Sequence, residues 1–321
     1  MLTLDARNPI CKHSVLSPGI DRNIMHIALY SRGFNKEDLD DIKLLLDELG
    51  KQEITPVIYE PFFRELKPHV QFPAEVDTFS KSADLDGKIE FLISLGGDGT
   101  LLDTVCFIKD KGIPVLGINF GRLGFLASIG REEIHEVVES LVDRNYSLDR
   151  RSLIHLDASI PLFDDVPYAL NEFTIHKKDT SAMVKIHTYL NGEFLNTYWA
   201  DGLIVSTPTG STGYSLSCGG PIVFPEASSF VITPVAPHNL NVRPIIIPDD
   251  QVISFEVEGR SDQFICTLDS RMEIIDNTVQ LAVKKESFEM NLVRLNDSNF
   301  LHTLRNKLLW GIDTRNPGGR R

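Results

Sequence analysis

"IEFLISLGGDGT", residues 89–100, joins an apolar, β-rich run to a glycine loop that contains one acid. A helix is expected next, because "TLLDTVCFIKDKG" (100–112) has helical character. Free backbone N–H groups and the helix dipole make such a junction an anion-binding point, and glycines let a phosphate approach the backbone closely. The stretch therefore predicts an α/β domain with a phosphate site at the carboxyl end of a strand.

The neighbouring segments repeat this alternation of strand and helix. "IMHIALYS" (24–31), "EITPVIYE" (53–60) and "IPVLGIN" (113–119) are short β-rich runs. Between them, "NKEDLDDIKLLLDELG" (35–50) places Leu39, Ile42, Leu46 and Leu49 on one helical face, and "REEIHEVVESLVDRN" (131–145) closes the region. We expect an α/β domain with a parallel sheet over residues 1–147, in which residues 1–22 form a loose leader.

The pattern changes over residues 148–292. Short β-rich runs are separated there by Asn-Gly, Pro-Asp-Asp and Glu-Gly turn signals, and long helical periodicity disappears. "DSNFLHTLRNKLLWG" (297–311) then returns to helix. We therefore expect an all-β, sandwich-like domain over 148–292, inserted into an α/β domain that residues 293–321 complete.

Composition excludes several classes of function. The 321 residues carry a net charge of −13, which argues against nucleic acid or an anionic membrane surface as a partner. Apolar runs are short and broken by charges, so we expect no membrane-spanning helix, and the N-terminus lacks the apolar core of a secretory signal. The four cysteines form no C-x-x-C pair, which favours buried free thiols in a reducing cytoplasm over a zinc site.

The acid of the glycine loop, Asp98, is the main chemical question. No Walker G-x-x-x-x-G-K-[ST] motif is present and the loop has no lysine, so phosphate charge would be neutralised most simply by Mg²⁺ carried in on a nucleotide. Asp98 could bind that metal, or it could take the proton of a hydroxyl that attacks the γ-phosphate. The alternative is a structural one, an aspartate that caps the helix while the glycines serve the turn.

Four further stretches carry candidate binding residues. "GINFGRLGFLA" (117–127) is a second glycine loop after a strand, and "NEF" (171–173) could clamp a ribose diol or form an ordinary polar turn. "ADGLIVSTPTGSTGYSLSCGGPIV" (200–223) is rich in small hydroxyls that suit sugar and phosphate oxygens, and Tyr214 could cover a base. In "VITPVAPHNLNVRPIIIP" (231–248), prolines stiffen a connection around His238. His238 could act as a general acid or base, but we expect it to hold a loop against the pocket.

Four of these motifs, taken together and in order, resemble the NAD kinase family: Gly-Gly-Asp-Gly-Thr, the downstream Asn-Glu, "DGLIVSTPTGSTGYSLSCGGPI" and "TPVAPHNLNVRP". The resemblance covers roughly residues 90 to 250. The Gly-Gly-Asp-Gly loop alone is shared with lipid kinases and phosphofructokinases, whereas the Thr-Pro-Thr-Gly-Ser-Thr stretch is far more specific. The resemblance implies an α/β domain plus a β domain, a nucleotide site in the cleft between them, and a homodimer or homotetramer.

The resemblance also implies a reaction and its residues. ATP would phosphorylate the 2′-hydroxyl of the adenosine ribose of NAD to give NADP, with Mg²⁺ on the phosphates and Asp98 as the base. The NAD site would consist of Gly99, Asn171, Glu172, Asp201, Thr212, Gly213, Tyr214, Ser215, Leu216, Ser217 and Ala236.

The sequence departs from the family pattern at three places. Gly213 stands where many relatives have alanine, Trp199 where many have a basic residue, and Asp269-Ser270-Arg271 where the family often reads Asp-Gly-Gln. These departures bear on fine contacts and on tolerance of NADH. A lipid or sugar kinase with the same glycine loop and a non-catalytic dinucleotide sensor are the competing interpretations. ATP or polyphosphate as donor, NAD or NADH as acceptor, oligomer size and effectors are left open.

Overall fold

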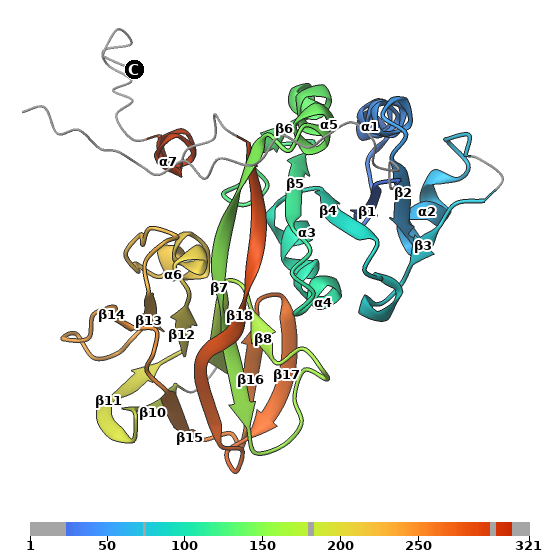
Figure 1. The fold of residues 1–321 in the computed structure, drawn as a ribbon. Coiled ribbons are helices and arrows are strands. Elements are labelled where there is room, and N and C mark those ends of the chain that lie inside the picture. Colours follow the sequence, from blue (N-terminus) through green and yellow to red (C-terminus); the bar gives the residue numbers. More distant parts are fainter. Residues whose placement is uncertain (1–23, 73–74, 179–182, 296–299, 310–321) are drawn as a thin grey trace, which may run out of the picture.

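The computed structural model of the chain describes residues 24–72, 75–178, 183–295 and 300–309, and the expected leader 1–22 lies outside them (Figure 1). Two sheets make up the β structure of this part of the chain. One is a large mixed sheet of the order β11-β10-β15-β18-β5-β4-β1-β2-β3, and the other is a six-stranded antiparallel sheet of the order β14-β13-β12-β9-β16-β17. Among the described residues, no helix is both long and apolar enough to cross a membrane.

The N-terminal half has the expected α/β arrangement, with parallel pairing among its strands. Its strands are β1 (His26–Tyr30), β2 (Thr55–Tyr59), β3 (Thr78–Phe79), β4 (Ile89–Leu95), β5 (Val115–Asn119) and β6 (Ile129–Gly130). Its helices are α1 (Leu39–Lys51), α2 (Glu60–Leu66), α3 (Asp98–Asp103), α4 (Val105–Ile108) and α5 (Ile134–Val142). Ile42, Leu45 and Leu49 of α1 are fully buried, so the helical periodicity of the sequence corresponds to a core-facing stripe.

The expectation of a helix after the first glycine loop is wrong in one respect. The segment forms two short helices, α3 and α4, instead of a continuous one. Thr104 stands at the break and is fully buried. Its backbone N–H and its hydroxyl both donate to the carbonyl of Leu101, at 3.0 and 2.6 Å. These bonds close an i→i+3 turn and take up a carbonyl that a continuous helix would use differently.

The C-terminal half is β-rich, as the sequence predicts. Its strands in the large sheet are β7 (Tyr146–Ala158), β8 (Tyr168–Ala169), β10 (Val184–Leu190), β11 (Glu193–Ala200), β15 (Ile253–Glu258) and β18 (Leu281–Leu295). The other sheet contains β9 (Glu172–Lys177), β12 (Gly202–Ser206), β13 (Ser229–Val235), β14 (Ile245–Pro248), β16 (Gln263–Leu268) and β17 (Arg271–Asp276). Residues of both sheets share one buried cluster, including Phe173, Phe230 and Phe255, which makes this half sandwich-like.

Two long antiparallel strands, β7 and β18, run through the middle of the molecule (Figure 1). β18 pairs with β15 near residue 281 and with β5 at Leu292, so the large sheet continues from one half into the other. β7 starts at Tyr146 and β18 ends at Leu295, so the expected boundaries 147/148 and 292/293 fall inside strands. The remaining helices are α6 (Tyr214–Ser217) and α7 (Phe300–Leu308).

A second buried cluster joins the two halves next to the glycine loop. It contains Leu101 and Val105 from the α3–α4 segment together with Leu153, Tyr168 and Leu170 from the β-rich half. Leu170 immediately precedes Asn171 and Glu172. The apolar contact therefore fixes the helix that carries Asp98 against the segment that carries the Asn-Glu pair.

Candidate active site

The first glycine loop, residues 96–100, connects β4 to α3 at the carboxyl edge of the parallel strands. Gly96 has φ +145°, and a Cβ there would lie 2.6 Å from the hydroxyl oxygen of Thr100. Gly97, and not Asp98, is the N-cap of α3. The interpretation of Asp98 as a helix cap is therefore wrong, and its carboxylate is available for another role.

Asp98 joins the first glycine loop to the second, residues 120–128. Its Oδ1 accepts the backbone N–H groups of Leu126 and Ala127 at 3.0 and 2.9 Å, and its Oδ2 accepts that of Phe125 at 2.8 Å. A Cβ on Gly124 would lie 1.7 Å from Oδ1, so only glycine leaves room for the carboxylate. These contacts explain the second glycine loop, which the sequence placed at this edge without giving it a function.

The lone pairs of Asp98 are unevenly used. A carboxylate offers about four acceptor positions, two on each oxygen. Oδ1 accepts two N–H groups and Oδ2 accepts one. These donors therefore leave one acceptor position on Oδ2 unused, and they hold the carboxylate in a single orientation.

Asn171 and Glu172 are held at the start of β9 by Asp269, a residue that the sequence did not mark as functional. The carboxylate of Asp269 accepts the N–H groups of Leu170, Asn171 and Glu172 at 2.9, 2.8 and 3.1 Å. Burial raises the pKa of Asp269, and these three donors and Arg271 act in the opposite direction. The only sequence signal for Asp269 was its place in the "Asp-Ser-Arg" stretch, where its aspartate agrees with the Asp-Gly-Gln pattern of the family.

Glu172 is the buried acid of the β-rich half. Burial, with a smaller contribution from the charge of Asp269, raises its pKa to about 8. Its Oε2 and the Oδ1 of Asn171 are buried and have no hydrogen-bond partner among the described residues. Buried polar atoms are normally paired, so these two atoms are poised for a polar ligand. At neutral pH the Glu172 carboxyl is mostly protonated and can donate as well as accept a hydrogen bond.

The hydroxyl-rich loop, residues 207–217, differs from the expectation in how it uses its hydroxyls. Thr207 donates to the carbonyl of Leu170, and Ser211 donates to that of Pro208 and accepts the N–H of Val223. Ser215 pairs with Thr233, and Thr209 accepts from buried Arg151. Thr212 donates to the Thr209 carbonyl at 3.2 Å. Most of these hydroxyls are already paired with protein groups, either within the loop or in the segments packed against it, as buried polar atoms need to be.

Glycines bring this loop against the Asn-Glu pair. A Cβ on Gly210 would lie 2.1 Å from the carbonyl oxygen of Asn171, so the backbones touch there. Gly213 faces the side chains, and its Cβ would lie 3.4 Å from Oε2 of Glu172 and 3.6 Å from Nδ2 of Asn171. An alanine would nearly fit at Gly213.

The remaining predicted residues lie on α6, directly before β12 or directly after β13. The exposed ring of Tyr214 stacks on His176 with centroids 5.6 Å apart, and Asp201 forms an ion pair with Lys177 at 2.5 Å. Asp201 donates its backbone N–H to the Val235 carbonyl, which places it beside exposed Ala236. Leu216 is half-buried and Ser217 is exposed.

The structure accounts for two of the departures from the family pattern. Arg271 donates to the backbone carbonyls of Val166 and Tyr168, so it fixes the chain that leads to Asn171. Trp199 is half-exposed and lies under the ammonium group of Lys185. His238 is exposed, and its backbone N–H donates to the Trp199 carbonyl, while no side-chain hydrogen bond of His238 to the pocket is found in the described part of the chain.

The residues present fit Mg²⁺ only as an ion held mainly by a nucleotide. Among the described residues, no group of three or more His, Cys, Asp or Glu side chains could hold a metal. Asp98 has a single acceptor position left, and nearby Asp103 is paired with Arg32. Phosphate oxygens are the ligands that would complete the coordination of Mg²⁺.

Comparison with known proteins identifies the family. Residues 48–146 match the domain family described as "ATP-NAD kinase N-terminal domain". Residues 170–295 match the one described as "ATP-NAD kinase C-terminal domain". An NAD kinase of Cytophaga hutchinsonii is 51% identical over 293 residues, which are 91% of this chain and 100% of that protein. An NAD kinase of Flavobacterium psychrophilum is 46% identical over 294 residues, again 91% of this chain and 100% of the relative.

Solved structures agree on the fold. Yeast NADH kinase complexed with NADH superposes with a TM-score of 0.83 at 21% identity, covering 91% of this chain and 89% of that one. An NAD kinase from Archaeoglobus fulgidus in complex with ATP gives a TM-score of 0.67 at 22% identity, covering 89% and 99%. The two domain matches and the near full-length relatives show that this chain belongs to the ATP-NAD kinase family.

Proposed function

We propose that Asp98 is the general base of the NAD phosphorylation that this family carries out. The observation that supports it most directly is the free acceptor position on Oδ2 of a carboxylate that three backbone N–H groups hold in place. A general base must be fixed within hydrogen-bond reach of the proton that it removes. Asp98 also lies at the carboxyl edge of the sheet, where open α/β sheets bind nucleotides.

In the proposed reaction, the 2′-oxygen of the adenosine ribose attacks the γ-phosphorus of ATP. The new O–P bond forms while the bond between the γ-phosphorus and the β,γ-bridging oxygen breaks, and ADP leaves. The proton of the 2′-hydroxyl passes to Oδ2 of Asp98. Mg²⁺, bound through the nucleotide phosphates, would supply charge neutralisation, and the glycine loop would position the phosphates.

NAD would lie along the hydroxyl-rich loop. Asn171 and protonated Glu172 would bind a ribose diol, since both have buried oxygens without partners. Tyr214 would cover the adenine, and Asp201 and Ala236 would border the far end of the pocket next to β12 and β13. Gly99, Thr212, Gly213, Leu216 and Ser217 complete this proposed site. Ser215 would act by holding the loop, because its hydroxyl is already paired with Thr233.

The same proposal covers organisation and location. Residues 148–292 would form an inserted NAD-binding domain, with 1–147 and 293–321 as the α/β domain. Exposed apolar side chains on the edge strand β17, Met272 and Ile274, support a homodimer or homotetramer, since an edge strand of this kind invites pairing with a second copy. The free thiols of Cys106, Cys218 and Cys266 support a cytoplasmic location.

Asp98→Asn tests the proposed base. We expect NADP formation from NAD, ATP and Mg²⁺ to fall in kcat by about 100-fold or more, while NAD still raises the melting temperature of the variant. EDTA should abolish the wild-type reaction. The matched control is Asp165→Asn, a change at an exposed carboxylate that pairs with Lys109. Turnover of Asp98→Asn close to that of the wild type would rule out the base.

A further inference from the structure

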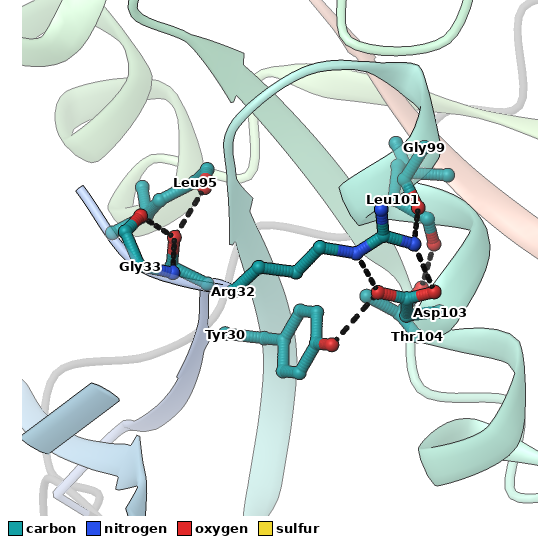
Figure 2. A network of polar contacts seen from close by, with 9 residues as sticks. Tyr30, Arg32, Gly33, Leu95, Gly99, Leu101, Asp103 and Thr104 are labelled. Atoms are coloured by element: carbon teal, nitrogen blue, oxygen red, sulfur yellow. Dashed lines mark hydrogen bonds and ion pairs between the residues drawn. The ribbon is translucent and has the colours of Figure 1, made fainter. Parts of the chain in front are cut away.

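The turn after β1 lies beside the first glycine loop and carries a basic residue. Ser31 donates its hydroxyl to the carbonyls of Leu95 and Gly33, at 2.8 and 2.7 Å, which ties the turn to the end of β4. Figure 2 shows the next residue, Arg32, reaching from this turn toward α3 and the Gly99 backbone. A segment almost 70 residues earlier in the chain thus supplies a cation to the loop, which has none of its own.

Arg32 is bound along one edge only. Its Nε and Nη2 donate to the two oxygens of Asp103 at 2.5 and 2.6 Å, and Nη2 also donates to the carbonyl of Gly99 at 3.1 Å (Figure 2). The third nitrogen, Nη1, lies over Gly99, 3.6 Å from where a Cβ would stand. Within the described residues, Nη1 makes no hydrogen bond, and the side chain is 52% exposed.

Asp103 is the fixed member of this pair. It lies on α3 with a side chain only 20% exposed, and it also accepts the hydroxyl proton of Tyr30 at 2.9 Å. Burial, followed by the charge of Asp103, raises the pKa of Tyr30, so this donor stays protonated. Two donors from β1 and its turn therefore hold Asp103, and Asp103 in turn orients the guanidinium.

We propose that the free Nη1 edge of Arg32 binds the terminal phosphates of the nucleotide donor. This inference rests on the proposed function. The loop 95–100 contains no lysine or arginine, and Asp98 and Asp103 make its surroundings acidic. A triphosphate needs a compensating cation there in addition to Mg²⁺. A guanidinium fits because the two N–H groups of Nη1 can bind phosphate oxygens while Nε and Nη2 stay on the carboxylate.

The geometry distinguishes two roles. Arg32 touches the donor, and Asp103 is a positioning residue that holds Arg32 with its free edge over Gly99. Arginine suits this position better than lysine. A single ammonium group cannot bind both oxygens of Asp103 and, at the same time, a phosphate on its other side. Gly99 has no side chain, so nothing on that residue covers Nη1.

Steady-state kinetics of Arg32→Met tests the proposal. We expect the KM for ATP to rise at least tenfold, while the KM for NAD stays within about twofold of the wild type. Inorganic tripolyphosphate serves as a probe without adenosine, and its inhibition constant against ATP should rise by the same factor. Arg32→Lys should restore part of the loss, and Asp103→Asn should raise the KM for ATP less than Arg32→Met does.

The matched control is Arg144→Met. Arg144 is 53% exposed and pairs with Glu90, near the start of β4. Because β4 has seven residues, this pair lies about 20 Å from the glycine loop, at the amino end of the same strand. It should change neither KM. Equal rises of both KM values in Arg32→Met, or an unchanged inhibition constant for tripolyphosphate, would overturn the proposal.

The experiment also separates this inference from the proposed function. If the wild type forms no NADP, the base and the reaction assigned to the site fail. Binding of tripolyphosphate can then still be measured by calorimetry in the wild type and in Arg32→Met. Loss of binding in the variant would uphold Arg32 as a phosphate ligand, and equal binding would refute it.

Discussion

Asp98 and Glu172 are two carboxyl groups that face opposite surroundings in the two halves of the molecule. Asp98 accepts three backbone N–H groups from the second glycine loop. Glu172 is buried with an oxygen that has no donor in the described structure, and its pKa is raised to about 8. Asp98 is therefore held by backbone donors, whereas burial around Glu172 favours the neutral acid.

The difference teaches that an acid's role depends on the donors that the fold brings to it. Hydrogen bonds to the charged form of a carboxylate favour that form, and burial without donors disfavours it. Asp98 is thus held in one orientation by backbone N–H groups, whereas Glu172 in its neutral form can donate a hydrogen bond. The following predictions test this contrast.

The largest effect on stability is expected from Gly124→Ala, which would fill the space that the Asp98 carboxylate occupies, here called the seat of Asp98. The new Cβ would lie 1.7 Å from Oδ1, so the carboxylate must leave its three N–H donors. Charged hydrogen bonds lost in a buried place predict a fall of about 3 kcal/mol in the free energy of unfolding, measured by urea denaturation. Gly121→Ala is the control, because its Cβ would lie 3.6 Å from the nearest atom. Equal stability of the two variants would contradict the seat.

Glu172→Gln is expected to change how stability depends on pH. The folded pKa of about 8 is raised from 4.5, so between these values the folded state binds the extra proton. The contribution of Glu172 to the free energy of unfolding is therefore full below about pH 4.5. It falls as the pH rises from about 4.5 to about 8 and levels off above that. Relative to the variant, the wild type should lose about 2 kcal/mol of unfolding free energy between about pH 6 and pH 7.5.

Urea denaturation at a series of pH values measures this difference. The exposed Glu193→Gln provides the control, since it changes the same chemical group without burial. Parallel pH profiles of the wild type and Glu172→Gln would show that Glu172 is already ionised in the folded protein, and the contrast with Asp98 would disappear.

The smallest effect is expected at Gly213. The Cβ of Gly213→Ala would meet Oε2 of Glu172 at 3.4 Å and the carbonyl of Gly210 at 3.3 Å, contacts that shifts of a few tenths of an ångström relieve. We expect a change within about 0.5 kcal/mol in thermal or urea denaturation. Gly210→Ala sharpens the result, because its Cβ would press on the Asn171 backbone at 2.1 Å and should cost about 2 kcal/mol. A larger loss at Gly213 than at Gly210 would contradict this packing.

The sequence predicted the elements that depend on local pattern. Alternation of strands and helices located the α/β half, and turn signals located the β-rich half. The glycine loop with Asp98 was found because consecutive glycines between a strand and a helix leave backbone N–H groups open to an anion. The Asn-Glu pair and the residues around Tyr214 were singled out by residue type, and the resemblance to the family then gave them specific roles.

The sequence did not predict contacts between distant segments. Asp269 holds Asn171 and Glu172 from almost a hundred residues away. Arg32, in the turn after β1, binds Asp103 on α3. A basic residue directly after the first strand, at the edge where the glycine loop lies, was the available signal for Arg32. The hydroxyls of residues 207–217 were assigned to a ligand, but most of the buried ones are paired with protein groups in the loop or next to it.

The position of β18 has a consequence for the order in which the protein assembles during synthesis. β18 lies between β15 and β5 in the large sheet, and it also pairs along its length with β7. It is the last strand of that sheet to leave the ribosome, although its place is in the middle. Until residues 281–295 emerge, β5 and β15 each lack a neighbour there, so the sheet can close only late in translation.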